Sequence, residues 1–380
     1  MTASQTVLAG KDTANQGDLY VSFELGDKQW KLSCNDGRGR RSPSRYTVDA
    51  GDKAAIVDVM RRARARCGLD PRALVHSCYE AGRDGWWLHR WLLEQGIDNI
   101  VVDSASIEVN RRARRAKNDR LDADKLLAML LRWHGGELRV WSVARAPTVQ
   151  QEDARRVDRE LQRLTGERTA HTNRIGSLLV LHNLRPARIG GRDWKKWWSA
   201  NSEQVPPELR AEIERESERL ALVKQQMKAI EAQRRQEVAD NKHPLVTQLS
   251  RLRAIGVTSA WMLDKELFGW RRFANRRQLA GCLGLAPTPY DSGNSQIEQG
   301  ISKAANKRVR TLLVELAWSW LRYQPDSALS QWYHRRFAEA GKRMRRVGIV
   351  ALARRLGVAL WRYLQYGEIP QGATLKPIQA

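Results

Sequence analysis

The sequence has few features of metal-binding, disulfide-rich or membrane proteins. Its four cysteines (Cys34, Cys67, Cys78 and Cys282) form no CxxC pair, and their scatter predicts reduced thiols in a cytoplasm. The seven histidines show no HxxxH or comparable spacing, so a zinc site is not expected. Apolar runs such as 312–321 are interrupted by charge and fall short of the ~18 residues of a membrane span. Residues 1–18 are polar and do not resemble a signal peptide.

Positive charge is what the sequence has in excess. Among 380 residues, 66 Lys and Arg stand against 42 Asp and Glu, which leaves a formal net charge of +24. Hydrophobic residues make up 42% of the chain, enough to form hydrophobic cores, and the length predicts two or three domains. A polycationic surface concentrates polyanions around it, so nucleic acid or an anionic membrane surface is the expected partner.

The first part of the chain predicts strands that precede and then alternate with helices. Leu19–Leu25 is rich in residues that favour strands, and Gly26-Asp27 predicts a turn into a second strand. The predicted strands are 19–25, 29–33, 45–48, 73–79 and 99–102, and the predicted helices are 53–67, 84–94 and one that begins near Asp119. This order predicts an α/β domain with a mixed sheet covered by helices, the arrangement of RNase H-like nucleases.

Long, charged helical sequence follows Pro147. In 208–239 the apolar residues recur at steps of 3, 4 and 7, close to the period of a coiled-coil seam. A second apolar series in 152–184 predicts either a helical hairpin or an intermolecular helix pair. A third, mainly helical unit is predicted from Leu245 to about Tyr366. We therefore predict domains at 1–146, 147–244 and 245–380, the last two all-α.

Four acidic residues lie where a metal site can form. Glu24 is in the first predicted strand, Glu80 follows the fourth, and Asp119 and Asp122 share one face of a helix start. The first and fourth strands are neighbours in an RNase H-like sheet, so these acids can converge. Clustered carboxylates repel one another unless they are protonated or neutralised, and Mg²⁺ takes hard oxygen ligands while leaving positions for phosphate. Two such ions can clamp the attacking and leaving oxygens of a phosphodiester.

A structural role is the alternative for each acid taken singly. Acids at a helix start favour the macrodipole, and an acid after a strand caps a turn. The joint pattern favours metal binding more than any member does, because a basic strip directly precedes the two aspartates. This strip consists of Arg111, Arg112, Arg114, Arg115 and Lys117. It is either a phosphate-binding strip beside a metal site or a solvated surface loop.

More basic residues are concentrated near the C-terminus. Between Ile301 and Tyr366 the chain carries fourteen lysines and arginines, and those closest to the Ile301 end are Lys303, Lys307 and Arg310, with Arg308 between them. A surface that neutralises several phosphates binds nucleic acid in a strongly salt-dependent way. RNA and DNA are both candidate ligands for this surface.

The tryptophans have two predicted roles. Trp318 and Trp320 lie in an apolar stretch and are predicted to be core anchors. Trp194, Trp197 and Trp198 lie beside lysines. They either stack on unpaired bases or form a wedge in the helical hairpin.

Several multi-residue blocks are specific enough to indicate a family. They are LYVSFELGDKQW (19–30), CYEAGRDGWW (78–87), VVDSASIEVN (101–110), RRAKNDRLDA (114–123), DSGN (291–294) and ISKAANK (301–307). With these blocks the chain resembles, over nearly its whole length, the DEDD transposases of the insertion-sequence one-ten family, most closely the subgroup eleven-eleven. The resemblance implies a RuvC-like N-terminal domain, a helical coiled-coil insertion and a C-terminal transposase domain with a catalytic serine.

The resemblance also implies site residues and partners. The family's acidic tetrad falls on Glu24, Glu80, Asp119 and Asp122, and its serine falls on Ser292. Glu24 stands where the generic pattern has Asp, and Asp27 is its nearest rival; the longer glutamate still reaches a metal if the strand is set back slightly. The implied partners are a guide (bridge) noncoding RNA, donor and target DNA, and further copies of the chain, as a dimer that assembles into a tetramer with composite sites.

Chemistry gives Ser292 a role of its own. A serine hydroxyl needs a base or a metal to act as a nucleophile, and its attack on phosphorus exchanges a DNA backbone bond for a phosphoserine bond. The intermediate conserves the bond, so strands can be exchanged without an external energy source. Gly293 leaves room for a close backbone approach. Ordinary turn chemistry is the alternative, and Ser295 and Ser302 are rival nucleophiles.

We therefore expect a cytoplasmic, nucleoid-associated, Mg²⁺-dependent and RNA-guided DNA recombinase that excises and inserts its own insertion sequence. A metal-only RuvC-like junction resolvase, in which water is the nucleophile, is the first alternative. A noncatalytic nucleic-acid-binding protein on a decayed nuclease scaffold is the second, and Glu24 in place of Asp favours it.

Overall fold

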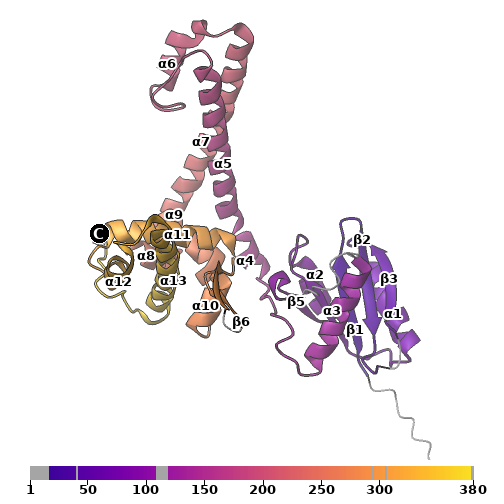
Figure 1. The fold of residues 1–380 in the computed structure, drawn as a ribbon. Coiled ribbons are helices and arrows are strands. Elements are labelled where there is room, and N and C mark those ends of the chain that lie inside the picture. Colours follow the sequence, from indigo (N-terminus) through magenta and orange to yellow (C-terminus); the bar gives the residue numbers. More distant parts are fainter. Residues whose placement is uncertain (1–16, 40–41, 108–118, 293–294, 304–305, 378–380) are drawn as a thin grey trace, which may run out of the picture. The chain divides into compact units, whose positions relative to one another are not determined.

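The computed structural model describes residues 17–39, 42–107, 119–292, 295–303 and 306–377 (Figure 1). The chain divides into two compact units, Met1–Pro147 and Thr148–Ala380. The predicted boundary at 146/147 lies beside this division, whereas the predicted boundary at 244/245 falls inside the second unit and stays a prediction. No helix among the described residues is long and apolar enough to cross a membrane.

The N-terminal unit is built on a five-stranded mixed sheet. Its strands are β1 (Leu19–Leu25), β2 (Gln29–Asn35), β3 (Ser44–Asp49), β4 (Val75–Glu80) and β5 (Asp98–Val102), in the order β3-β2-β1-β4-β5. β1 is antiparallel to β2 and parallel to β4. The mixed sheet and the adjacency of the first and fourth strands are therefore confirmed, while the RuvC-like assignment stays a prediction.

Alternation along the strands gives the sheet two different faces. Leu19, Val21 and Phe23 pack in one core with helices α1 (Lys53–Cys67) and α2 (Trp87–Glu94). Cys78 and Val102 face the other way and pack against α3 (Asp119–His134) in a second core. Figure 1 shows α3 lying across the sheet near β1. Side chains at even positions of β1, β4 and β5 therefore lie on the α3 side.

Several predicted boundaries in this unit differ from the structure by one to three residues, and two of them are wrong for identifiable local reasons. The helix predicted at 84–94 begins only at Trp87, because Gly85 has a φ of +70°, which a right-handed helix does not contain. The strand predicted to start at residue 73 starts at Val75. The Ala73 N–H instead closes a turn onto the Asp70 carbonyl oxygen at 2.9 Å.

The second unit starts with α4 (Val149–Asp153) and a long helical hairpin. Its arms are α5 (Arg156–Val180) and α7 (Pro207–Ala239), which run side by side in Figure 1. The segment that connects the arms in sequence contains α6 (Trp194–Asn201) and the short 3-10 helix η3 (Ser202–Gln204). Seam residues of both arms pack together, for example Leu161 with Val223. Of the two predicted alternatives, the structure shows the intramolecular hairpin.

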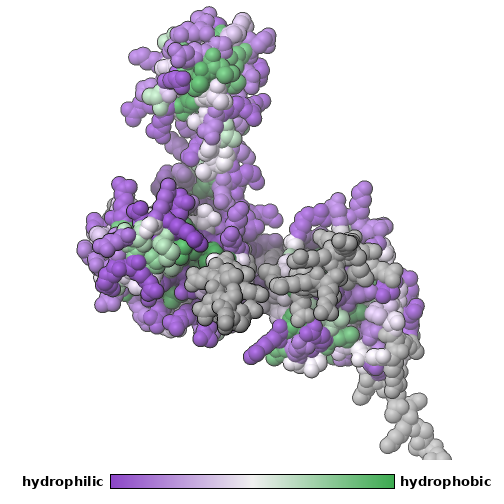
Figure 2. Space-filling view, in the orientation of Figure 1, coloured by the Kyte–Doolittle hydropathy of each residue, from purple (hydrophilic) through white to green (hydrophobic). Residues whose placement is uncertain are grey.

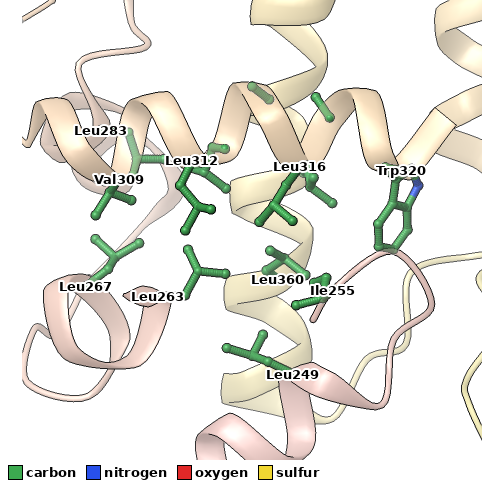
Figure 3. Close-up of a cluster of buried hydrophobic side chains, with 14 of the residues drawn as sticks. Leu249, Ile255, Leu263, Leu267, Leu283, Val309, Leu312, Leu316, Trp320 and Leu360 are labelled. Carbon is green, nitrogen blue, oxygen red and sulfur yellow. The ribbon is translucent and has the colours of Figure 1, made fainter. Parts of the chain in front are cut away.

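The rest of the unit is mainly helical, and we call it the C-terminal module. Its α-helices are α8 (Pro244–Ser250), α9 (Val257–Leu263), α10 (Arg276–Leu283), α11 (Lys307–Tyr323), α12 (Ala328–Phe337) and α13 (Lys342–Tyr366). Its core is a single apolar cluster, part of which Figure 3 shows around Leu263, Leu312 and Leu360. The segment predicted as mainly helical also contains a two-stranded antiparallel hairpin, β6 (Pro287–Ser292) and β7 (Ser295–Ile301).

The tryptophan predictions have mixed outcomes. Trp320 is fully buried as predicted, but the prediction for Trp318 is wrong, because this side chain is 52% exposed. Residues two apart in a helix lie about 200° apart around the axis, so one apolar stretch presents both faces. Trp194 is buried in the hairpin core and stacks on Trp197 at a 5.5 Å centroid distance. This packing matches the wedge alternative.

Buried charges join the hairpin to the C-terminal module. Arg234 of α7 contacts Asp158 of α5 at 3.1 Å, and both side chains are at most 4% exposed. Arg308 of α11 reaches the same carboxylate at 3.4 Å, and Arg159 pairs with buried Glu266 of η4 (Asp264–Phe268) at 3.0 Å. Burial raises the pKa of Asp158, and the two arginines offset this only in part. If one member of this network were removed, a buried charge would be left without its partner, which is costly. The network therefore favours one arrangement of the hairpin against the C-terminal module.

Candidate functional site

A cleft of about 600 Å³ opens at the end of the sheet where β1 and β4 finish. Its walls include Glu24, Glu80 and Asp122, three of the four acids that the sequence singles out. Glu24 and Asp122 are half-buried, and Glu80 is exposed. The fourth acid, Asp119, is the first residue of α3, but its side chain lies outside the described residues.

Strand register explains why Glu24 and Glu80 share the cleft. Phe23 of β1 is paired with Tyr79 of β4 in the parallel register, so the glutamates are the next residue of each strand. Both have even numbers and lie on the α3 side of the sheet. Asp122 lies in the first turn of α3, which begins at the same end of the strands.

Hydrogen bonds fix the start of α3 on the sheet. The buried hydroxyl of Ser22 donates to the carbonyl oxygen of Ala123 at 2.7 Å. The Ser33 hydroxyl donates to Asp124 Oδ1 at 2.6 Å, and Arg45 approaches both oxygens of this carboxylate at 3.1 Å or less. These contacts are made by the two residues that directly follow Asp122, so the position of Asp122 is tied to β1, β2 and β3.

Three further charged residues that line the cleft, Arg83, Asp84 and Lys125, were not singled out by the sequence. Arg83 forms an exposed ion pair with Asp27 at 2.6 Å. A signal existed for Lys125, because it follows Asp122 by three residues and so shares its helix face. Asp27, the rival of Glu24, borders the same cleft with a side chain that is 76% exposed.

The donor set of the cleft fits Mg²⁺. Glu24, Asp27, Glu80, Asp84 and Asp122 bring carboxylate oxygens to one cavity. Oxygen ligands are the kind that magnesium prefers. The openness of the cleft to solvent leaves room for a phosphate and water beside such an ion.

Similarity to known proteins is extensive. The chain is 39% identical to the candidate transposase y4rJ of Sinorhizobium fredii strain NGR234 over 379 residues, which cover 95% of each chain. It is 25% identical over 298 residues, 76% of each chain, to the transposase for insertion sequence element IS1111A of Coxiella burnetii. A sequence profile of the transposase IS116/IS110/IS902 family matches residues 246–334.

The chain belongs to the IS116/IS110/IS902 family of transposases. Membership implies DNA cleavage and strand transfer as the general activity of this transposase. The predicted family is thus confirmed at this level, because IS110 is the one-ten family that the sequence blocks resemble.

Ser292 is in the second unit of the transposase. It is the last residue of β6 and pairs with Ser295 of β7, so the serine lies at the tip of the β6–β7 hairpin. The side chains of residues 289–299 and the whole of residues 293–294 lie outside the described residues. The sequence signal for this hairpin is Gly293-Asn294, a dipeptide typical of two-residue turns, between two strand-forming runs.

The predicted nucleic-acid-binding residues of the transposase fall into two groups. The basic strip Arg111, Arg112, Arg114, Arg115 and Lys117 lies outside the described residues. Near the start of α11, Lys303 and Lys307 are exposed, while Arg310 is half-buried. Their role in binding stays a prediction.

A groove of about 890 Å³ in the C-terminal module collects six more arginines. They come from α10, α12 and α13 and are Arg276, Arg277, Arg335, Arg354, Arg355 and Arg362. The guanidinium of Arg355 lies 4.2 Å from the ring centre of Trp332, which holds it against the groove wall. Figure 2 shows hydrophilic residues over much of the visible face of this module.

Proposed function

We propose that this transposase is an RNA-guided DNA recombinase of the subgroup eleven-eleven type, which excises and inserts its own insertion sequence at the bacterial nucleoid. The observation that carries the proposal is the convergence of Glu24, Glu80 and Asp122 in one cleft of a chain that belongs to a transposase family. The three acids come from three elements and lie up to 98 positions apart in the sequence, yet they line the same cleft.

In the proposed site, Glu24, Glu80, Asp119 and Asp122 would hold Mg²⁺, which when bound would neutralise charge on the phosphodiester that is cut. The role of the surrounding residues is to position the acids and the phosphate. Ser22, Ser33 and Arg45 hold the helix that carries the aspartates. Lys125 supplies a cation on the cleft wall that attracts phosphate.

Ser292 is the proposed nucleophile. A bond forms between its Oγ and the phosphorus, one P–O bond of the DNA backbone breaks, and the leaving sugar oxygen takes up a proton. A hydroxyl of the second DNA strand later attacks the phosphoserine, restores a phosphodiester and returns the proton to Ser292. One bond is exchanged for an equivalent one in each step, so no external energy source is needed.

The arginine groove of α10, α12 and α13 supports a nucleic-acid backbone in this proposal. Arg362 pairs with Glu368 of the same groove at 3.7 Å. The other five guanidiniums can contact phosphates, and arginine suits the planar, bidentate geometry of such contacts. A guide (bridge) RNA pairs with donor and target DNA, and a dimer assembles into a tetramer in which the acidic cleft and Ser292 form composite sites.

The experiment traps the intermediate on a suicide DNA substrate, with the element's noncoding RNA and Mg²⁺ present. Wild type is expected to yield a covalent protein–DNA adduct that resists denaturation, and Ser292→Ala is expected to yield none. Ser302→Ala is the matched control and should still form the adduct. Full cleavage by Ser292→Ala with free phosphate ends would overturn the serine mechanism in favour of a water-dependent, metal-only nuclease.

Guidance by RNA is tested separately. RNA that copurifies with the transposase expressed from its intact element is sequenced, and recombination is measured with and without it. We expect a structured RNA from the element with segments complementary to donor and target sites. Recombination at the same rate without RNA would contradict guidance by RNA. It would not bear on the proposed role of the acidic cleft.

A further inference from the structure

A second cluster of metal-ligand side chains lies at the opposite end of the sheet from the acidic cleft. His76 is near the start of β4, Asp98 is the first residue of β5, and His134 is the last residue of α3. One ligand atom from each of these residues lies within 4.8 Å of the others. Glu80 follows His76 by four positions along β4, about 13 Å at the rise of a strand, so the two sites are distinct.

The fold builds this cluster from distant parts of the sequence. His76 pairs with Asp98 in the β4–β5 register, and both have even numbers that place them on the α3 side. The α3 helix starts at the acidic cleft and ends over the strand beginnings, so its last residue meets them. The ring centres of His76 and His134 are 4.1 Å apart.

The surroundings of His76 resemble the outer shell of a metal site. Its Nδ1 lies 2.8 Å from Asp98 Oδ2, and its Nε2 lies 3.3 Å from Asp18 Oδ2. Each ring nitrogen thus faces a carboxylate. When one nitrogen binds a metal, the other donates its N–H to a carboxylate, which is the usual way in which proteins orient a metal-binding histidine.

The charges around the cluster favour a bound cation. The carboxylates of Asp98 and Asp18 each lie within 3.3 Å of a ring nitrogen of His76. Two carboxylates beside two closely packed imidazoles supply the negative charge that a divalent ion balances.

We propose that His76, Asp98 and His134 bind a divalent transition-metal ion, for which zinc is the best match, with Asp18 holding the free nitrogen of His76. Two imidazoles and a carboxylate form a zinc ligand set, whereas magnesium prefers oxygen alone. In tetrahedral zinc sites neighbouring ligand atoms lie about 3.4 Å apart, so the present 4.8 Å limit requires only small side-chain movements.

The bound ion acts as a structural staple in this proposal. It ties the end of α3 to β4 and β5, just as Ser22 and Asp124 tie its beginning to β1, β2 and β3. Because α3 also carries Asp122, both ends of the helix are then fixed against the sheet. This role does not depend on the proposed recombinase mechanism.

The test uses the full-length chain, stripped of metal with a chelator and titrated with zinc alone, in buffer without nucleic acid. We expect one zinc ion per chain by elemental analysis, a higher temperature of unfolding on zinc addition, and a tetrahedral d–d absorption spectrum with Co²⁺. His134→Gln removes an exposed ligand and is expected to weaken zinc binding by about tenfold or more while the fold, checked by circular dichroism, is retained.

Two control variants make the result specific. His334→Gln removes another exposed histidine, in the second unit, and should bind zinc like wild type. Glu80→Gln alters the acidic cleft and should also leave zinc binding unchanged. Equal zinc stoichiometry and affinity in wild type and His134→Gln, or a wild type that takes up no zinc, would overturn the proposal and leave the cluster as a hydrogen-bonded network.

Discussion

The Ser22 hydroxyl donates a hydrogen bond of 2.7 Å to the backbone carbonyl oxygen of Ala123, 101 residues further along the chain. Ser22 is fully buried in the central strand, two residues before Glu24, and Ala123 directly follows Asp122. One contact therefore connects the two elements that bring these acids to the same cleft. This hydrogen bond fixes the position of α3 along β1.

Replacing Ser22 by alanine is expected to lower the free energy of unfolding by about 1 kcal/mol, the net value of one buried hydrogen bond. Because Asp122 then moves relative to Glu24, the Mg²⁺ concentration for half-maximal cleavage should rise. Ser77→Ala is the matched control. It removes a buried 2.7 Å bond to Asn99 on the opposite face of the sheet, so it should cost similar stability without changing the Mg²⁺ requirement. Equal Mg²⁺ responses would contradict the positioning role.

Glu80→Gln is expected to reduce DNA cleavage by roughly 10²–10³-fold, because charge stabilisation by a metal site is worth several kcal/mol and 1.36 kcal/mol is a factor of ten. The side chain is exposed, so the unfolding transition should remain unchanged. Single-turnover cleavage at saturating Mg²⁺ measures the effect. Glu94→Gln, an exposed acid at the end of α2, serves as the control. Cleavage by Glu80→Gln at the rate of this control would remove Glu80 from the site.

Arg354→Gln in the arginine groove is expected to weaken nucleic-acid binding in a salt-dependent way. Each duplex phosphate contact contributes about 0.9 to the slope of log K against log salt, so the slope should fall by roughly that amount. Fluorescence anisotropy over a range of salt concentrations measures it. Arg61→Gln, which changes an exposed arginine of α1 paired with Asp58, should leave the slope as it is. An unchanged slope in Arg354→Gln would place the nucleic acid elsewhere.

The hairpin should lose stability in acid because of Glu216. His171 hydrogen bonds to this buried carboxylate, as do Arg219 and Arg174, and together they lower its pKa from 4.5 to about 2 despite its burial. A depressed carboxylate pKa stabilises the folded state above pH ~4.5, and this contribution is lost as the pH falls from there toward about 2. The sign is therefore a loss of stability on acidification.

Glu216→Gln tests this linkage, because the amide cannot titrate. Urea unfolding at about pH 5 should show wild type more stable than the variant, and the gap should narrow at about pH 3. Glu214→Gln is the control on the same helix and should keep the wild-type pH profile. A constant gap between wild type and Glu216→Gln at both pH values would contradict the assignment.

Local sequence patterns predicted much of the fold. The strand at 19–25 and the helix at 53–67 were located with their correct bounds, because alternation and a helix-period pattern are encoded by neighbouring residues. The β6–β7 hairpin was missed because its strands lie among helices, and Gly293-Asn294 is a short signal. Trp318 was misplaced because an apolar stretch does not tell which side of its helix faces the core.

The candidate cleft was partly predictable. Glu24, Glu80 and Asp122 were named from sequence because strand order and family resemblance both pointed to them. The hydrogen bonds from Ser22 and Ser33 that hold α3 could not be predicted from the sequence, because a serine in a strand does not indicate which group its hydroxyl will contact. The His76–Asp98–His134 cluster was missed for a related reason. Its members stand 22 and 36 positions apart, and no spacing motif covers ligands that strand pairing and a helix end bring together.

By itself, the sequence determined the family of this protein, its excess of positive charge, and most strands and helices of the N-terminal unit, because these depend on composition and on contacts between near neighbours in the chain. Only the tertiary structure decided which side chains meet. It did so through the parallel register of β1 with β4, the direction of α3 across the sheet and the buried charges between hairpin and module. These relationships join residues far apart in sequence, and their geometry follows from packing the whole chain at once.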